Sequence, residues 1–259
     1  MKLGAQLYSV RDMCQNATDY RETFRKIKEI GYEVVQISGG CAIEAEKLRA
    51  YSDEFDLPIT STHRGFAEFV NSTDELIQYH KILGCKTIGI GSMPVEYRGS
   101  LEATREFIKV MKTPIAKIRD AGFRFSYHNH AFEFDNISGT NAFNVLIDEA
   151  PEMDFILDVG WSTFAGADTL SYIKRIGVGK RMIDVHFKDF TCKQGETENA
   201  GSAICHCGGG IVDFLPIYKL CVEIGVENAQ VEQDNAPDLG DSFGEMKKSY
   251  DYLSAFFRG

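Results

Sequence analysis

Side chains that can bind a metal ion or move a proton end four short apolar segments in the second half of this chain. The segments are Phe123–His128, Met153–Asp158, Arg181–His186 and Asn228–Glu232, each followed by a loop and helix-like sequence. In a β/α barrel the carboxyl ends of successive strands meet at one face and carry the catalytic groups. We therefore expect a metal-dependent enzyme that acts on a small polar molecule.

Three of these terminal residues are predicted metal ligands: Asp158 in LDVGW, His186 in VHFKD and Glu232 in VEQD. An Asp after an apolar run can also cap a helix or form a turn, but no helix is expected to begin directly after Asp158. His186 is followed closely by Lys188 and Asp189, and burying so many ionisable groups without a function would be costly. For Glu232 the alternative is a surface carboxylate in an acidic loop.

The fifth expected strand offers more than one ligand, because it continues as His128-Asn129-His130-Ala131-Phe132-Glu133. A mixed carboxylate and imidazole set suits Mn²⁺, Co²⁺, Zn²⁺ or Fe²⁺ better than the all-oxygen set that Ca²⁺ prefers. His63 ends the third expected strand, and we expect it to face the substrate from across the barrel mouth.

A second metal site is not expected at Cys205-His206-Cys207, although Cys192 precedes it. The two cysteines are closer than in the usual zinc-binding pair, and no second pair exists. The glycines at 208–210 indicate little more than a turn. The odd number of cysteines, 7, favours reduced thiols over a disulfide framework.

The elements that must position these side chains alternate between strand and helix. Four more strands are expected before the four above, and eight β/α units in about 250 residues fit a closed (β/α)₈ barrel. Residues 1–259 are therefore predicted to form a single TIM-barrel domain. An open doubly wound sheet is the alternative, but the first strand lacks the Gly-rich nucleotide loop that this fold uses. The expected strands are Lys2–Tyr8, Glu33–Ser38, Pro58–His63, Lys86–Ile90 and the four above, and the expected helices span roughly 18–30, 43–55, 73–83, 100–120 (kinked or split at Pro114), 141–149, 168–175, 213–224 and 244–257.

Bulk composition narrows the partners. The formal net charge of -10 and the pI near 5.1 disfavour nucleic acid, since an acidic surface repels phosphates. No stretch is apolar and long enough for a membrane span or a signal peptide, so a cytoplasmic location is the default expectation.

Several motifs together resemble a known family. MKLGAQLYSVRD, YHNHAFEF, LDVGW, VHFKD, GGGIVDF and VEQD are similar to the sugar phosphate isomerase/epimerase group of xylose isomerase-like TIM barrels. The resemblance implies one divalent ion held by Glu, Asp, His and Glu at the ends of strands five to eight. Asp158, His186 and Glu232 match the last three. His128 stands where the first Glu is expected, so Glu133 is taken as that ligand, with a histidine of the HNH triplet as the alternative.

The same resemblance implies the chemistry. The ion (Mn, Co, Zn or Mg) would polarise the carbonyl of a sugar as a Lewis acid, and side chains would move a proton between carbons to isomerise or epimerise it. The implied catalytic residues are Glu133, Glu232, His63, His130 and Lys188, and the implied substrate-binding residues are His128, Trp161, Lys188 and His63. Two departures, Gln36 and Gly209 in place of acidic residues, imply an altered substrate.

Other outcomes fit the same motifs. A lyase or dehydratase acting on a keto-sugar, keto-inositol or 3-keto-glycoside would use the same site and expel a leaving group. A DNA-repair endonuclease would need more His than the 6 present and a basic face. A sugar-binding barrel without catalysis is the remaining alternative. Homo-oligomers are common in the group that this chain resembles.

Overall fold

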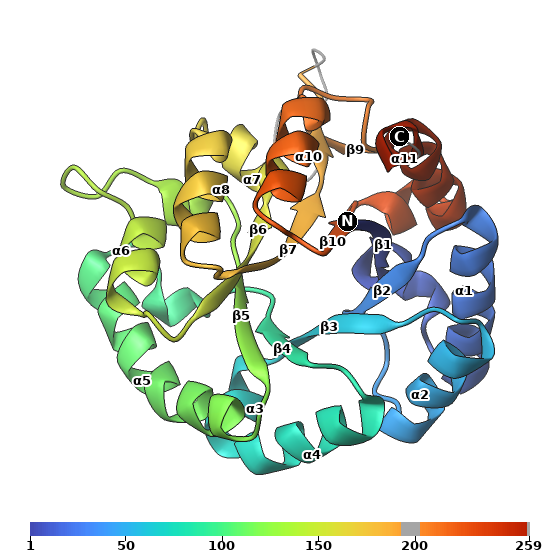
Figure 1. The fold of residues 1–259 in the computed structure, drawn as a ribbon, viewed down its shortest axis with the longest axis horizontal. Helices are drawn as coiled ribbons and strands as arrows, with labels where there is room; N and C mark the ends of the chain where they lie inside the picture. Colours follow the sequence, from blue (N-terminus) through green and yellow to red (C-terminus); the bar gives the residue numbers. More distant parts are fainter. Residues whose placement is uncertain (193–202, 258–259) are drawn as a thin grey trace.

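The computed structural model describes residues 1–192 and 203–257. Its strands form a closed barrel, and helices surround the barrel as an outer ring (Figure 1). This confirms the predicted TIM barrel. The predicted extent of the domain also included residues 193–202 and 258–259, which lie outside the described residues.

All pairings within the barrel are parallel, and the closed order is β1-β10-β7-β6-β5-β4-β3-β2. The pairing of β10 with β1 closes the ring by joining the last and the first strand of the barrel. The strands are β1 (Lys2–Gln6), β2 (Val34–Ile37), β3 (Ile59–Arg64), β4 (Thr87–Ile90), β5 (Arg124–His128), β6 (Asp154–Asp158), β7 (Met182–Phe187) and β10 (Asn228–Val231).

The helices follow the strands and turn one apolar face toward the barrel. In α1, for example, Tyr20, Phe24 and Ile27 are buried, whereas the residues between them are mostly exposed or half-buried. The described α-helices are α1 (Ala17–Ile30), α2 (Ala45–Glu54), α3 (Phe66–Asn71), α4 (Thr73–Leu83), α5 (Leu101–Asp120), α6 (Ala142–Glu149), α7 (Val159–Phe164), α8 (Thr169–Val178), α10 (Phe214–Glu223) and α11 (Ser242–Phe257). Short 3₁₀ helices are η1 (Leu7–Met13), η2 (Val95–Tyr97), η3 (Phe132–Phe134) and η4 (Ala236–Leu239).

Helix ends follow local chemistry. The Asn16 side chain accepts a hydrogen bond from the amide of Asp19 at the start of α1 (3.0 Å), which satisfies one of the free amides there. At the end of α4, Gly84 has a φ of 75°, a conformation that glycine adopts without steric cost. None of the described helices is both long and apolar enough to cross a membrane.

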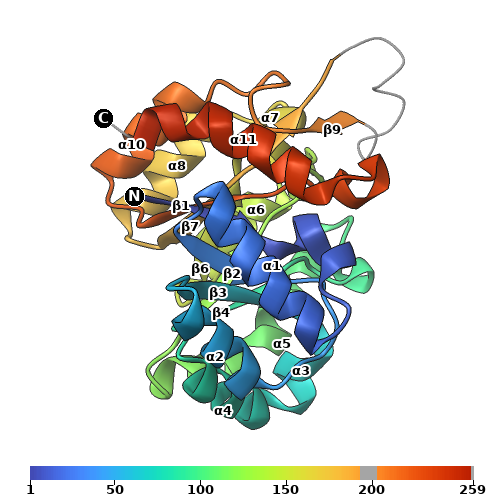
Figure 2. The ribbon, with the colours of Figure 1, turned by 90° about the vertical axis from the view of Figure 1, so that its right-hand side faces the viewer.

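Three details differ from the sequence-based expectation. The helix expected to be kinked or split at Pro114 is not split: residues Leu101–Asp120 form one helix, α5. A short helix, α7, begins directly after Asp158, where none was expected. Two short strands, β8 (Asp189–Phe190) and β9 (Ile204–Cys205), pair antiparallel after β7 (Figure 2). The last two differences lie in the loops at the carboxyl ends of the barrel strands.

Candidate metal centre

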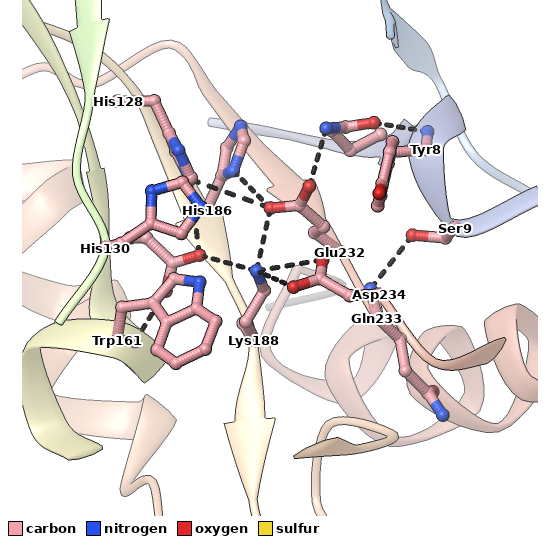
Figure 3. Close-up of polar contacts among 12 residues, drawn as sticks. Tyr8, Ser9, His128, His130, Trp161, His186, Lys188, Glu232, Gln233 and Asp234 are labelled. Atoms are coloured by element: carbon pink, nitrogen blue, oxygen red, sulfur yellow. Dashed lines mark hydrogen bonds and ion pairs between the residues drawn. The ribbon is translucent and has the colours of Figure 1, made fainter. Parts of the chain in front are cut away.

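The register of the strands brings three of the predicted ligands together. Asp158 at the end of β6 pairs in register with His186 on β7. The amide of Glu232 donates to the carbonyl of Phe187 (3.0 Å), so Glu232 lies beside the end of β7 on its other side. His128 ends β5, which pairs with β6. Parallel pairing without large shifts thus places all four side chains at one end of the barrel. Figure 3 shows three of them, His128, His186 and Glu232, pointing toward one another.

Among the described residues, these four side chains form the group able to hold a metal ion. Each offers one ligand atom, and the atoms lie within 4.8 Å of one another. This spread is close to the separation of about 4 Å between ligands on opposite sides of one first-row ion. All four residues are at most 5% exposed. Two imidazoles and two carboxylates suit a first-row divalent ion better than Ca²⁺.

The two imidazoles are oriented from behind. His128 Nδ1 lies 2.9 Å from the carbonyl oxygen of Gly91, so Nδ1–H donates there and the Nε2 lone pair faces the group. His186 Nε2 lies 2.7 Å from Oε1 of Gln36, so that nitrogen donates and the Nδ1 lone pair faces the group. An outer hydrogen bond that fixes the tautomer is typical of histidines that bind metals.

The two carboxylates are oriented in the same way. Asp158 Oδ1 accepts from the amide of Trp161 at 2.7 Å, and Glu232 Oε1 accepts from Nε2 of Gln6 at 2.6 Å. The second oxygen of each carboxylate faces the imidazoles: Asp158 Oδ2 is 3.4 Å from His128 Nε2, and Glu232 Oε2 is 2.9 Å from His186 Nδ1. Ligand atoms from all four side chains therefore converge, and a positive charge beside them stabilises that arrangement.

Asp158 serves two purposes at once. It caps α7, as the capping alternative requires, and it also presents an oxygen to the ligand group. The expectation that no helix begins there is therefore wrong. The two roles are compatible, because the cap uses only Oδ1 and leaves Oδ2 for the ligand group. Gly160 allows α7 to approach the chain after β7 closely: a Cβ there would lie 2.5 Å from the carbonyl oxygen of Lys188.

Lys188 supplies a buried positive charge beside the group. Its Nζ lies 3.2 Å from Asp158 Oδ2, 3.1 Å from Glu232 Oε2 and 3.0 Å from Asp234 Oδ1. Burial alone would lower the pKa of Lys188, but these carboxylates hold it above its ordinary value. Burial would likewise raise the pKa of Glu232, yet Lys188 and His186 hold it well below its usual range. Both groups are thus charged at neutral pH.

Two further imidazoles flank the ligands without joining them. His63 packs against His128 and His186, with ring centroids 5.0 and 5.4 Å apart. His130 packs against His128 (5.0 Å) and Trp161 (5.5 Å). His63 Nε2, His130 Nδ1 and Trp161 Nε1 are buried atoms with no hydrogen-bond partner. Burial lowers the pKa of His63 well below its usual range and that of His130 to about 3, so both rings are neutral.

Glu133 does not reach the ligand group. Its carboxylate accepts from the Tyr127 hydroxyl (2.6 Å) and the His130 amide (2.8 Å), and it is fully buried in η3. Burial raises its pKa to about 7. After His130 the chain enters η3, and Tyr127 and the His130 amide hold both oxygens of the Glu133 carboxylate there. The structure therefore joins His128, and not Glu133, to the three other predicted ligands.

The residues that orient the ligands could not be recognised from the sequence. They are Gln6 and Gln36, of which only Gln36 stands out, as a departure from the family pattern. Both lie at or next to the carboxyl ends of their strands, β1 and β2, and are fully buried. The available signal in the sequence was an amide side chain at the carboxyl end of an apolar strand. Asp234 was also missed, although it follows Glu232 by two residues.

Comparison with known proteins places this site in context. The profile of the xylose isomerase-like TIM barrel family matches residues 24–234. No curated protein gives a significant match. Among solved structures, a sugar phosphate isomerase/epimerase from Parabacteroides distasonis is similar, with a TM-score of 0.80, 20% identity, and coverage of 98% of this chain and 94% of that chain.

Two other solved structures are also similar in fold. The IOLI protein, whose structure contains a zinc atom, has a TM-score of 0.77 at 12% identity and covers 100% of this chain and 99% of its own. A probable 3-DHS dehydratase, AsbF from Bacillus anthracis, has a TM-score of 0.72 at 15% identity, with coverage of 98% and 99%. At these identities the likeness shows the fold alone. The family profile, which matches most of the chain, shows that the protein belongs to the xylose isomerase-like TIM barrel family.

Proposed function

We propose that this protein is a divalent-metal-dependent isomerase or epimerase of a small keto- or aldo-sugar. The observation that supports this most directly is the convergence of four ligand atoms, each oriented by a hydrogen bond from outside the group. The metal ligands in this proposal are His128, Asp158, His186 and Glu232. His128 takes the place that the sequence analysis gave to Glu133.

The bound ion would act as a Lewis acid on a substrate carbonyl, which makes the adjacent C–H acidic. The chain itself provides the groups that move the proton. His63 and His130 lie on different sides of His128, and each has a buried nitrogen without a partner. Two neutral imidazoles in different positions allow a proton to be removed at one place and returned at another, as isomerisation and epimerisation require.

Lys188 and Trp161 complete the proposed substrate site. The ammonium group of Lys188 is fixed by carboxylates on β6 and after β10, so it can stabilise negative charge on a substrate oxygen without reorganising. Its Nζ lies 5.1 Å from the centroid of the Trp161 ring. The Trp161 ring would face the apolar side of a sugar, and its free Nε1–H would donate to a hydroxyl.

The test is the metal content of the purified protein, measured by elemental analysis after supplementation with Mn²⁺, Co²⁺ and Zn²⁺. We expect near-stoichiometric metal in wild type and in Glu133→Gln, and little in His128→Gln. Each variant changes one buried residue, His128 at the end of β5 or Glu133 in η3 shortly after it, so each controls for the other. A folded wild-type protein that binds none of these ions would overturn the proposal. Loss of metal in Glu133→Gln but not in His128→Gln would restore the first assignment of the ligand.

A lyase or dehydratase is the second candidate. The imidazoles of His63 and His130 favour it, because an imidazole that removes the substrate proton becomes an imidazolium, which can then donate that proton to the departing hydroxide or alkoxide. The similarity in fold to a probable dehydratase is in keeping with this outcome. Mass analysis of products from a panel of keto-sugars distinguishes the two candidates. Isomerisation conserves the mass of the sugar, whereas elimination gives an unsaturated or shortened product.

A further inference from the structure

A cavity of about 430 Å³ lies beside the metal ligands, between the loops that follow β2 and β3. Its wall contains Tyr20 from α1, Cys41 from the β2 loop, His63 and Arg64 from β3, Glu68 from α3 and Tyr79 from α4. The volume lies within the range of about 300–1,000 Å³ that is usual for small-molecule sites. It is large enough for one sugar ring.

His63 connects this cavity to the ligand group. His63 is one of the residues in the cavity wall, and its imidazole packs against the rings of His128 and His186, at 5.0 and 5.4 Å. Its Nε2 is buried and has no hydrogen-bond partner. The cavity and the ligand group therefore share a neighbouring residue, as a substrate of two linked parts requires.

The charges in the wall indicate a neutral occupant. Among the described residues that line the cavity, Arg64 is the one guanidinium or ammonium, and its Nε lies 3.2 Å from Oε1 of Glu68. The same guanidinium stacks on the Tyr79 ring at 4.7 Å. Arg64 and Glu68 thus neutralise each other. A phosphate group is normally bound by cations that are free to pair with it, and the wall offers none.

The remaining wall chemistry suits a polyhydroxylated ring. The hydroxyl of Tyr20 donates to the carbonyl of Cys41 (3.3 Å), and that of Tyr79 donates to the carbonyl of Ile43 (3.1 Å). Both tyrosine oxygens therefore keep lone pairs that can accept from sugar hydroxyls. Aromatic rings beside hydrogen-bonding groups provide the apolar and polar contacts that a ring with hydroxyls on its edge needs.

The opposite side of the mouth is filled. Trp161 packs on Phe190 with ring centroids 4.8 Å apart, and both pack with Ala203 and Ile204 in a small apolar cluster. These four residues are at most 9% exposed. A substrate that extends beyond the metal thus has room on the β2–β3 side and little on the β6–β7 side.

We propose that the cavity is a subsite for a second, neutral sugar ring, so that the substrate is a glycoside or disaccharide and not a sugar phosphate. This inference rests on the proposed function for the reactive ring at the metal. The second ring would lie against Tyr20, Tyr79 and Arg64, and His63 would lie at the junction between the two rings.

Cys41 provides a direct reporter, because it is a half-buried free thiol in the cavity wall. The rate of its alkylation by iodoacetamide is measured by peptide mass spectrometry on the metal-supplemented protein. The probes are cellobiose, maltose, glucose and glucose 6-phosphate. We expect a neutral disaccharide at about ten times its dissociation constant to slow the labelling of Cys41 by about 10-fold, because about one site in ten then stays empty. Glucose 6-phosphate should have no effect. Labelling of the exposed Cys192 is the internal control.

Two tryptophan variants locate the ring. Ala42→Trp fills the cavity from an exposed position in its wall, whereas Ala165→Trp adds the same side chain at an exposed position after α7 on the other side of the mouth. Calorimetry should show disaccharide affinity weakened by about 10-fold in Ala42→Trp and unchanged in Ala165→Trp. The metal content of both variants should equal that of wild type.

Three results would overturn the inference: protection by glucose 6-phosphate without protection by a disaccharide, no protection by any neutral sugar, or equal loss of affinity in the two tryptophan variants. Labelling is repeated after chelator treatment, which separates this inference from the proposed function. If the protein binds no metal but a disaccharide still protects Cys41, the cavity is supported as a sugar site. In that case the failure to bind metal contradicts only the proposed function.

Discussion

Two buried polar layers inside the barrel share strand β7 but differ in the partners they give to their carboxylates. Near the carboxyl end, Glu232 lies 3.1 Å from Lys188 Nζ and 2.9 Å from His186 Nδ1. Deeper in the barrel, Asp184 accepts hydrogen bonds from neutral groups: Asn228 at 2.9 Å, Ser61 at 3.2 Å and Thr60 at 3.4 Å. Both residues are at most 5% exposed.

The difference shows what decides the state of a buried carboxylate. Burial raises the pKa of Asp184 to about 6, since the neutral donors only partly offset it. In Glu232 the ammonium of Lys188 is the main neighbour that outweighs burial, and the pKa lies well below the ordinary value. A buried carboxylate bound only by neutral donors has a raised pKa, whereas one beside a buried ammonium group stays ionised and can bind a metal ion.

Removal of the lysine should have the largest effect. Lys188→Met leaves two buried carboxylates and the half-buried Asp234 without their cation, so we expect the free energy of unfolding of the metal-free protein to fall by about 3–5 kcal/mol. Added Mn²⁺ or Zn²⁺ should restore part of this loss. Urea denaturation with and without metal measures both effects, and the exposed Lys219→Met is the control. An unchanged unfolding midpoint in Lys188→Met would show that the charges are not coupled.

Matched substitutions in the two layers come next. Glu232→Gln and Asp184→Asn each replace a buried carboxylate by its amide. Glu232→Gln should weaken metal binding by more than about 100-fold, because loss of a ligand exceeds the effect of losing an outer partner. Asp184→Asn should leave the affinity nearly unchanged. Competition with a chelator of known affinity gives both constants, and similar losses in the two variants would erase the distinction between the layers.

His80 extends the comparison to a site outside both layers. It is buried between α4 and β3, where Nδ1 donates to the Leu76 carbonyl (2.7 Å) and Nε2 lies 2.7 Å from the Thr62 hydroxyl. Burial lowers its pKa to about 4, while in the unfolded chain it is about 6.5. The folded pKa is the lower one, so the associated stability is complete above pH 6.5 and is lost as pH falls through 4.

The measurement for His80 is the free energy of unfolding at several pH values. Wild type should lose about 2 kcal/mol relative to His80→Gln between pH 8 and pH 5. The comparison with the variant removes the contributions of other titrating groups that the two proteins share. Parallel pH profiles for wild type and variant would mean that His80 keeps its ordinary pKa when folded.

The smallest effect should come from the outer hydrogen bonds. Gln36→Leu removes the acceptor of His186 Nε2–H, and metal affinity should fall by about 10-fold. Gln230→Leu is the control, since this buried amide donates to Thr60 in the deeper layer. A near-equal effect of the two substitutions, measured by chelator competition, would argue that Gln36 does not orient the ligand.

Much of this architecture could be predicted from the sequence, because the spacing of apolar residues and the residues that begin or end helices are local properties. The alternation of apolar strands with amphipathic helices predicts the barrel, and a metal-competent residue at each strand end predicts Asp158, His186 and Glu232 as neighbours. The first helix, expected over 18–30, spans Ala17–Ile30. Local chemistry also explains where it begins and ends.

The parts that could not be predicted depend on the path of the chain between elements. Glu133 and His128 lie five residues apart, and either could face the barrel axis until the turn after His130 is known. The start of α7 at Asp158 was missed because Val159-Gly160-Trp161 is too short a segment to show a helical period. Gln6 and Gln36 carry neither the imidazole nor the carboxylate that a first-row ion prefers, so the sequence alone does not connect them with the metal site.

The sequence by itself determined the fold, the acidic character and the presence of ligand-competent residues at the ends of the strands, since each follows from residue order and side-chain type. Only the tertiary structure decided which of them meet. Barrel closure brings Gln6 of β1 to Glu232 after β10, 226 positions apart, and Gln36 of β2 to His186 of β7, 150 positions apart. These contacts depend on barrel closure, strand register and inward orientation, which no local pattern encodes.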